Sequence, residues 1–251
     1  RSTLFPYTTL FRSRSTYSVE SDSIGKGFYM DIDDGGNIII YEWTVGSATL
    51  DVVQVYNANY QLIRVDSLGL VGRCDMPTCA GNLVTGRGAY FTAANSATKV
   101  LRYNYVDGVR TTVDTITVPV AMGGNSSVAP VDVDHFYVQS RGNALMYIDC
   151  SGEEPVVTNM TYFGASTFTS AYGGKEFDLG GHRLYVMGTY KDGGYLGTFG
   201  VFDVTDPANP YQIVAEHSKM GTAAMGTACV TFRVVVHGDT AHIYEYACYA
   251  V

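Results

Sequence analysis

The sequence predicts an all-β protein with the β-propeller architecture, built from about five four-stranded, blade-like repeats. Three observations support this fold class. The chain contains 28 glycines and 20 tyrosines but only 7 prolines, which is typical of many short strands joined by tight turns. Apolar runs alternate with turn residues, and no helical periodicity interrupts them. Similar strand-like runs recur along the whole chain.

The spacing of these runs indicates a repeat. Their centres are separated by 52, 46, 49 and 57 residues, starting from Ile39 and continuing through Phe91, Tyr137, Val186 and Ile243. A period near 50 residues with about four strands in each period is typical of propeller blades. An irregular sandwich or barrel is the alternative that the spacing disfavours.

Individual strands follow from apolar runs that end at glycine, asparagine, aspartate or proline. The pattern predicts strands over 27–32, 37–43, 50–56, 61–66, 89–94, 99–105, 111–118, 135–139, 145–149, 155–158, 183–188, 195–204, 211–215, 232–236 and 242–246. The turn at 33–36, Asp-Asp-Gly-Gly, is a strong hairpin signal. A calcium loop over 31–37 is a weaker interpretation, because Gly35 occupies a ligand position.

Stretches of small residues precede the repeats. They cover residues 81–88, 121–129, 164–174 and 220–229. Innermost strands of a propeller crowd around the axis, where large side chains would clash. We therefore expect these stretches to belong to the innermost strands and the loops leading into them. Their backbone groups could also line the mouth of the central channel, where propellers commonly hold ligands.

The two ends of the chain look incomplete. Residues 4–13 read LFPYTTLFRS, which resembles a translated sequencing adapter, so we expect residues 1–13 to lie outside the fold. The last strand-like run continues to Val251 without a turn or polar tail. We expect residues 14–251 to form a single propeller domain that is truncated at both ends.

Composition limits the classes of partner. The formal net charge of the chain is −8, and no cluster of lysine and arginine is visible, which argues against nucleic acid and anionic membranes. No apolar run approaches the length of about 18 residues that a transmembrane helix needs.

The sequence has five cysteines, an odd number, and two of them stand close together. Cys74 and Cys79 could close a small disulfide loop, or they could be reduced thiols packed as small apolar groups. The spacing between them matches neither a redox pair nor a zinc pair. None of the five histidines forms a pair with metal-site spacing, and we expect no metal and no cofactor.

One turn carries a resemblance to a known family. Residues 202–210 read FDVTDPANP, which resembles the repeat of the LVIVD-type bacterial propellers, whose units end in a D-V-S/T-D-P-x-x-P turn. The match covers about 15 residues in one repeat, and the other repeats lack the two prolines. The resemblance implies a propeller fold and a secreted or surface-anchored protein whose signal peptide was lost by truncation. It implies no catalytic residue.

Several common motifs for catalysis are absent from the sequence. It contains no G-x-S-x-G, H-E-x-x-H or phosphate-binding loop. Two acidic–histidine groupings, Asp132 and Asp134 with His135 and Asp178 with His182, occur near the same phase of the repeat, which repetition alone can explain. If the chain is an enzyme, a glycoside hydrolase or polysaccharide lyase is the expected class. Its weak catalytic candidates are Asp75, Asp132, Asp178 and His182.

Aromatic residues give the remaining indication of function. Several lie in or beside loops rich in small residues, where exposed rings could stack on sugars or anchor protein contacts. The candidate binding residues are Tyr162, Phe163, Phe168, Tyr172, Tyr190 and Tyr195. The sequence therefore favours a non-catalytic, extracytoplasmic binding or scaffold protein with a glycan or protein ligand, and a carbohydrate-active enzyme is the alternative.

Overall fold

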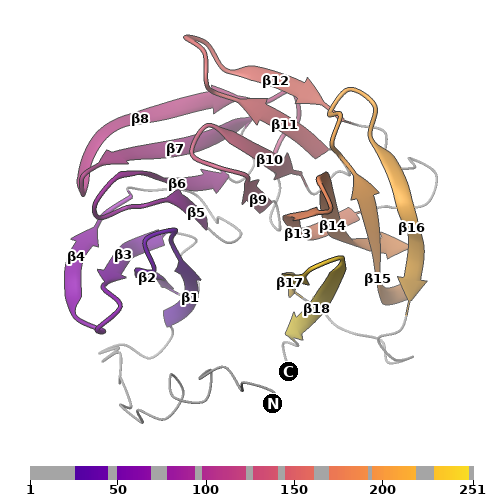
Figure 1. Ribbon diagram of the computed structural model, residues 1–251, viewed down its shortest axis with the longest axis horizontal. Helices are drawn as coiled ribbons and strands as arrows, with labels where there is room; N and C mark the ends of the chain where they lie inside the picture. The colour runs from indigo at the N-terminus through magenta and orange to yellow at the C-terminus, as the bar shows by residue number, and fades with distance from the viewer. Residues whose placement is uncertain are drawn as a thin grey trace, which may run out of the picture.

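The protein is a β-propeller. A computed structural model describes residues 26–44, 50–68, 78–93, 98–122, 127–140, 145–160, 170–191, 194–218 and 229–248. Their strands form four four-stranded antiparallel sheets and one two-stranded sheet. Figure 1 shows these sheets arranged as blades around a common axis, which confirms the predicted fold class.

Each blade is a meander in which neighbouring strands pair in chain order. Blade 1 holds β1 (Lys26–Ile32), β2 (Ile38–Thr44), β3 (Leu50–Tyr56) and β4 (Leu62–Asp66). Blade 2 holds β5 (Thr78–Gly81), β6 (Arg87–Ala93), β7 (Lys99–Val106) and β8 (Val109–Thr117). Blade 3 holds β9 (Ser127–Pro130), β10 (His135–Gln139), β11 (Leu145–Asp149) and β12 (Val156–Asn159). Blade 4 holds β13 (Ser170–Leu179), β14 (His182–Lys191), β15 (Gly194–Asp203) and β16 (Tyr211–Ser218). Blade 5 holds β17 (Cys229–His237) and β18 (Thr240–Cys248).

The predicted runs all overlap observed strands, and the five repeat centres all fall in the second strand of a blade. The innermost strands β5, β9 and β13 were not predicted as strands. They overlap or adjoin the stretches of small residues, as expected for positions near the axis. The described part of blade 5 has two strands rather than the predicted four. The adapter-like residues 1–13 lie outside the described residues.

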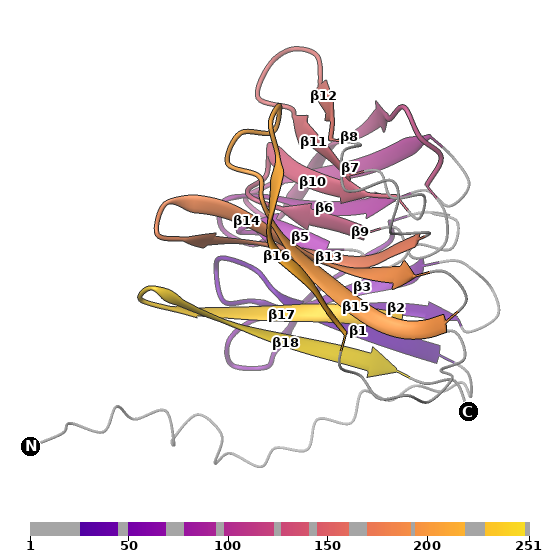
Figure 2. The same cartoon turned by 90° about the vertical axis from the view of Figure 1, so that its right-hand side faces the viewer.

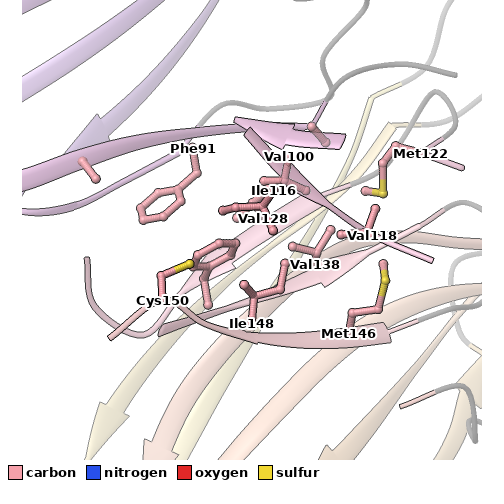
Figure 3. Close-up of a cluster of buried hydrophobic side chains, with 13 residues drawn as sticks. Phe91, Val100, Ile116, Val118, Met122, Val128, Val138, Met146, Ile148 and Cys150 are labelled. Carbon is pink, nitrogen blue, oxygen red and sulfur yellow. The ribbon is translucent and has the colours of Figure 1, made fainter. Parts of the chain in front are cut away.

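Apolar side chains fill the space between neighbouring blades. Between blades 2 and 3, Phe91 of β6 packs on Phe136 of β10 with ring centroids 4.8 Å apart. Figure 3 shows Phe91 in the same cluster as Val138 and Ile148. Met146 and Ile148 of β11 complete this cluster, and all of these side chains are fully buried. Similar clusters lie between blades 1 and 2, blades 3 and 4, and blades 4 and 5. Blades 2 to 4 are therefore buried on both faces.

A buried tyrosine occupies the second strand of each four-stranded blade: Tyr41, Tyr90, Tyr137 and Tyr185. Tyr41 and Tyr90 meet edge to face across one inter-blade boundary, and the rings of Tyr137 and Tyr185 lie 5.5 Å apart across another. The ring of Tyr185 also explains one glycine of the innermost strand. A Cβ atom at Gly174 would lie 1.6 Å from the Tyr185 hydroxyl, so no larger residue fits there.

Removing a buried ring between blades should destabilise the whole propeller. We expect Phe136→Ala to lower the free energy of unfolding by about 3–5 kcal/mol, because it leaves a cavity opposite Phe91. Val156→Ala, at a position that is 59% exposed on β12, is the control and should change the free energy by about 0.5 kcal/mol or less. Urea unfolding followed by circular dichroism measures both. Equal effects for the two variants would contradict the assigned packing.

Candidate functional site

The described turn-capping side chains and the ion pair of Arg87 with Asp134 lie at one edge of the propeller. In a four-stranded meander, the turn between the first and second strands and the turn between the third and fourth lie at the same edge. We call this edge the turn edge; Figure 2 shows the β13–β14 and β17–β18 turns projecting from it. Its turns comprise residues 33–37, 57–61, 82–86, 107–108, 131–134, 150–155, 180–181, 204–210 and 238–239. The connections at the opposite edge all include residues outside those described.

Side-chain oxygens cap the turns between the third and fourth strands. Asp149 Oδ1 accepts hydrogen bonds from the backbone N–H and the hydroxyl of Ser151, at 2.8 and 2.6 Å. These bonds hold the pKa of Asp149 below its usual value. Asp203 Oδ1 accepts from the backbone N–H of Thr205 at 2.9 Å in the same way. These carboxylates therefore stabilise the turns between the third and fourth strands.

His135 is held between two carboxylates at the turn edge. Its Nδ1 lies 2.9 Å from Asp132, its Nε2 lies 3.4 Å from Asp149, and its ring stacks on Tyr147. Burial would raise the pKa of Asp132, but hydrogen bonds from His135 and from the backbone N–H groups of Asp134 and His135 outweigh it, and the pKa is lowered. Asp132 is therefore a poor proton donor near neutral pH.

In blade 4, His182 is likewise the first residue of the second strand. Its Nδ1 lies 2.8 Å from Asp203 Oδ2, which also accepts from the Tyr211 hydroxyl at 3.1 Å. The His182 side chain is 62% exposed and that of Asp203 only 6%. A buried carboxylate thus orients an exposed imidazole, as in the base half of a catalytic triad. In the part of the chain that the structure describes, His182 forms no hydrogen bond with a serine, threonine or cysteine.

Asp178 is not the partner of His182 that proximity in sequence suggested. Its Oδ1 accepts from the backbone N–H of Gly181 at 3.2 Å and so supports the β13–β14 turn. No sequence pattern points to Asp203 as the partner of His182, because 21 residues separate the two. Asp75, the fourth catalytic candidate, lies outside the described residues.

Buried ion pairs join blades 2 and 3. Arg102, whose side chain is only 10% exposed, bonds Asp114 at 2.7 Å and Asp134 at 2.9 Å. Asp134 also pairs with Arg87. Burial would raise the pKa of Asp134, but the two guanidinium groups outweigh it and lower the pKa. These charges are thus neutralised within the interface.

A second network joins blades 1 and 2. Arg64 Nε donates to both oxygens of Asp66, at 2.9 and 2.8 Å, and its Nη1 donates to the carbonyl of Gly108 at 2.9 Å. The hydroxyl of Tyr90 donates to Asp66 at 2.9 Å. The Asp33 carboxylate accepts from the backbone N–H of Leu83 at 2.8 Å, so the predicted hairpin turn bonds to the next blade.

Glu176 of β13 is the described carboxylate whose pKa is clearly raised. Burial is the cause, and it outweighs the opposing effect of Arg183, with which Glu176 pairs. Asp178 lies two residues further along the same strand, so both carboxylates face the same side of the sheet. Sequence reasoning missed Glu176 because no motif surrounds it.

Three of the six candidate aromatic residues lie in described strands, at the opposite edge of the propeller. Register places the backbones of Tyr172, Tyr190 and Tyr195 at the end of blade 4 near the β14–β15 connection, away from His182. Tyr162, Phe163 and Phe168 lie outside the described residues. The catalytic candidates Asp132, Asp178 and His182 and the described binding candidates therefore occupy opposite edges of the propeller.

The described residues also bear on three other features: metal-ligand groups, membrane-spanning helices and paired cysteines. They contain no group of three or more histidine, cysteine, aspartate or glutamate residues placed to hold a metal ion. No helix among them has the length and apolar character needed to cross a membrane. Cys79 and Cys150 are free, buried thiols, and Cys74 lies outside the described residues.

Comparison with known proteins adds little to this description. No protein-family profile matches the chain, and no curated protein matches it. Among solved structures, the chain is similar to dihydro-heme d1 dehydrogenase NirN in complex with DHE, with a TM-score of 0.48 and 14% sequence identity. The similarity covers 86% of this chain and 41% of that one. A likeness this distant says nothing about the chemistry of this chain.

Breaking the ion pairs between blades 2 and 3 should be costly. We expect Asp134→Asn to lower the free energy of unfolding by about 3 kcal/mol, because Arg87 and the buried Arg102 lose a charged partner. Asp178→Asn, which keeps an acceptor for its turn, should change it by about 0.5 kcal/mol or less. Urea unfolding at neutral pH compares the two variants. A smaller loss for Asp134→Asn than for the control would contradict the network.

Asp203 should make the fold sensitive to acid. Burial would raise its pKa, but hydrogen bonds from Thr205, His182 and Tyr211 outweigh it and lower the pKa to about 2. The unfolded value is about 3.9, so the ionised carboxylate stabilises the fold above about pH 4, and this contribution disappears as the pH falls toward 2. Urea unfolding between about pH 2.5 and 7 should show a steeper loss of stability for wild type than for Asp203→Asn. Parallel curves would contradict this role.

Proposed function

We propose that this chain is a non-catalytic β-propeller that binds a glycan or protein ligand outside the cytoplasm. The main observation behind the proposal is that four aspartates at the turn edge are already paired or hydrogen-bonded. Asp132, Asp134, Asp149 and Asp203 are all hydrogen-bonded or ion-paired, and the pKa of each is lowered. Such groups stabilise turns and blade contacts and are poorly suited to donate protons in catalysis.

The ligand proposal is supported by the aromatic residues of blade 4. The backbones of Tyr172, Tyr190 and Tyr195 come together at the edge opposite the ion pairs. Aromatic rings stack on the apolar faces of sugars and also anchor protein contacts. The LVIVD-like turn at 202–210 supports a secreted or surface-anchored address.

A carbohydrate-active enzyme is the second candidate, because of Glu176. A carboxyl group with a raised pKa is what a general acid needs, and Asp178 is a second carboxylate on the same side of β13. Residues two apart along a strand are separated by about 7 Å, which lies within the range of carboxylate pairs in glycosidases. The ion pair of Glu176 with Arg183 argues against this role, because it favours the charged form.

Glycan binding by the full chain tests the proposal. A glycan array followed by calorimetry on the best ligand should show binding, and replacing Tyr172, Tyr190 and Tyr195 together by alanine should weaken it at least about tenfold. The control is Tyr244→Ala, at a tyrosine that is 50% exposed on β18, and it should leave the affinity unchanged.

An activity assay on the same glycan distinguishes an enzyme from a non-catalytic binding protein. Release of reducing ends from the bound glycan by wild type, abolished in Glu176→Gln, would overturn the non-catalytic proposal. Binding that persists in the triple tyrosine variant would move the site away from blade 4. Absence of glycan binding would leave the protein-ligand form, for which cross-linking from the same three positions on intact cells is the decisive measurement.

A further inference from the structure

The outer edge of blade 2 differs from the outer edges of the other four-stranded blades. The fourth strands β4, β8, β12 and β16 lie at the rim of the propeller, as Figure 1 shows, and each pairs with only one described strand. Such an edge presents backbone N–H and C=O groups to a further strand. Blades stacked beside a sheet cover its faces and leave its outer edge open, so the exposure of these edges does not depend on the number of blades.

Three of the four outer strands carry features that discourage pairing with a further strand. β4 has five residues, which include Arg64 and Asp66, and β12 has only four residues and follows Pro155. β16 follows Pro210, and its pairing with β15 shifts register twice. Short length, charges, prolines and bulges are the means by which proteins protect the edges of their sheets.

β8 lacks these features along most of its length. It is the longest of the four outer strands, with nine residues and no proline. One register shift lies near its start, and residues 112–117 then pair one for one with residues 104 down to 99. The one charged residue of this stretch, Asp114, lies 2.7 Å from the guanidinium of Arg102, so its charge is neutralised. Residues 112–117 therefore form an unprotected edge.

The side chains of this stretch favour an uncharged partner. Val113, Thr115 and Thr117 alternate along the strand and so point to the same side of the sheet. Val113 is 47% exposed, and both threonines are exposed. A strand added outside β8 places its own side chains beside this row, where β-branched neighbours pack well and a charged neighbour finds no opposite charge.

We propose that the outer edge of β8 over residues 112–117 docks an extended, uncharged segment of a partner protein, which adds to blade 2 as a fifth strand. Backbone hydrogen bonds supply the affinity, and the row of Val113, Thr115 and Thr117 selects β-branched side chains. The partner has to be an extended segment, because a helix keeps its own backbone groups paired. This surface lies on a different blade from the tyrosines proposed to bind the glycan or protein ligand.

Fluorescence anisotropy with the full chain tests the docking site. The probe is a fluorescein-labelled peptide of alternating threonine and valine with a lysine at each end, and wild type should bind it with a Kd of about 10–100 μM. The same peptide methylated on every backbone nitrogen has no amide donors and should not bind. Val113→Lys places a charge on the edge and should weaken binding at least about tenfold.

The matched control is Val156→Lys, at a 59% exposed position of the outer strand β12. It adds the same charge to a different rim position and should bind the peptide like wild type. Circular dichroism and urea midpoints establish that both variants fold. Equal binding by wild type and Val113→Lys overturns the proposal.

Hydrogen–deuterium exchange locates the bound peptide. The peptide should slow exchange of the backbone amides in residues 112–117 and leave those in residues 156–159 unchanged. Protection of another outer strand instead overturns the proposal. So does the absence of binding up to about 1 mM, because docking through the backbone demands little of the peptide sequence.

A second copy of the chain is the remaining occupant of this edge. Sedimentation velocity without peptide distinguishes it: a dimer that forms in wild type and is lost in Val113→Lys overturns docking of a partner segment. None of these measurements involves the tyrosines of blade 4. Failure of this docking site and failure of the ligand proposal are therefore separately measurable.

Discussion

Face-to-face packing of neighbouring blades is the constraint on which this structure depends. Blades 2 to 4 bury both faces, so their second and third strands carry large apolar side chains in both phases of the strand. Polar groups that remain between blades must then be paired, because an unpaired buried charge is far more costly than a buried methyl group. Arg102 with Asp134, and Arg64 with Asp66, meet this condition.

The buried tyrosines connect this packing to the small residues near the axis. A tyrosine in the second strand reaches into the neighbouring blade, and its hydroxyl needs a partner there: Tyr90 finds Asp66, and Tyr137 finds the carbonyl of Val204. The ring also takes up space beside the innermost strand, which therefore carries a small residue such as Gly174. In blade 4, one requirement thus links a buried tyrosine of the second strand to a glycine of the innermost strand.

The same packing decides what could be predicted from the sequence. The second strands could be predicted because they are apolar runs that recur at a regular period. For β10, both the first and the last residue were predicted correctly. Innermost strands such as β9 were not predicted, because their small residues do not form the apolar pattern that indicates a strand. His135 and Asp132 were grouped correctly because they are close in sequence. Arg102 and Asp134 were not, since 32 residues separate them and only the stacking of two blades brings them together.

The repeat itself indicates which turn-edge residues are structural and which are free to vary. Asn57, Asp149 and Asp203 occupy equivalent turns, and each accepts a hydrogen bond from the backbone N–H two residues later. The first residue of the second strand, in contrast, changes from blade to blade: isoleucine and arginine in blades 1 and 2, histidine in blades 3 and 4. The turn therefore forms with or without an imidazole beside it. The turn does not depend on a histidine at this position. Where a histidine is present, its ring contacts a carboxylate that also accepts a backbone hydrogen bond within the turn.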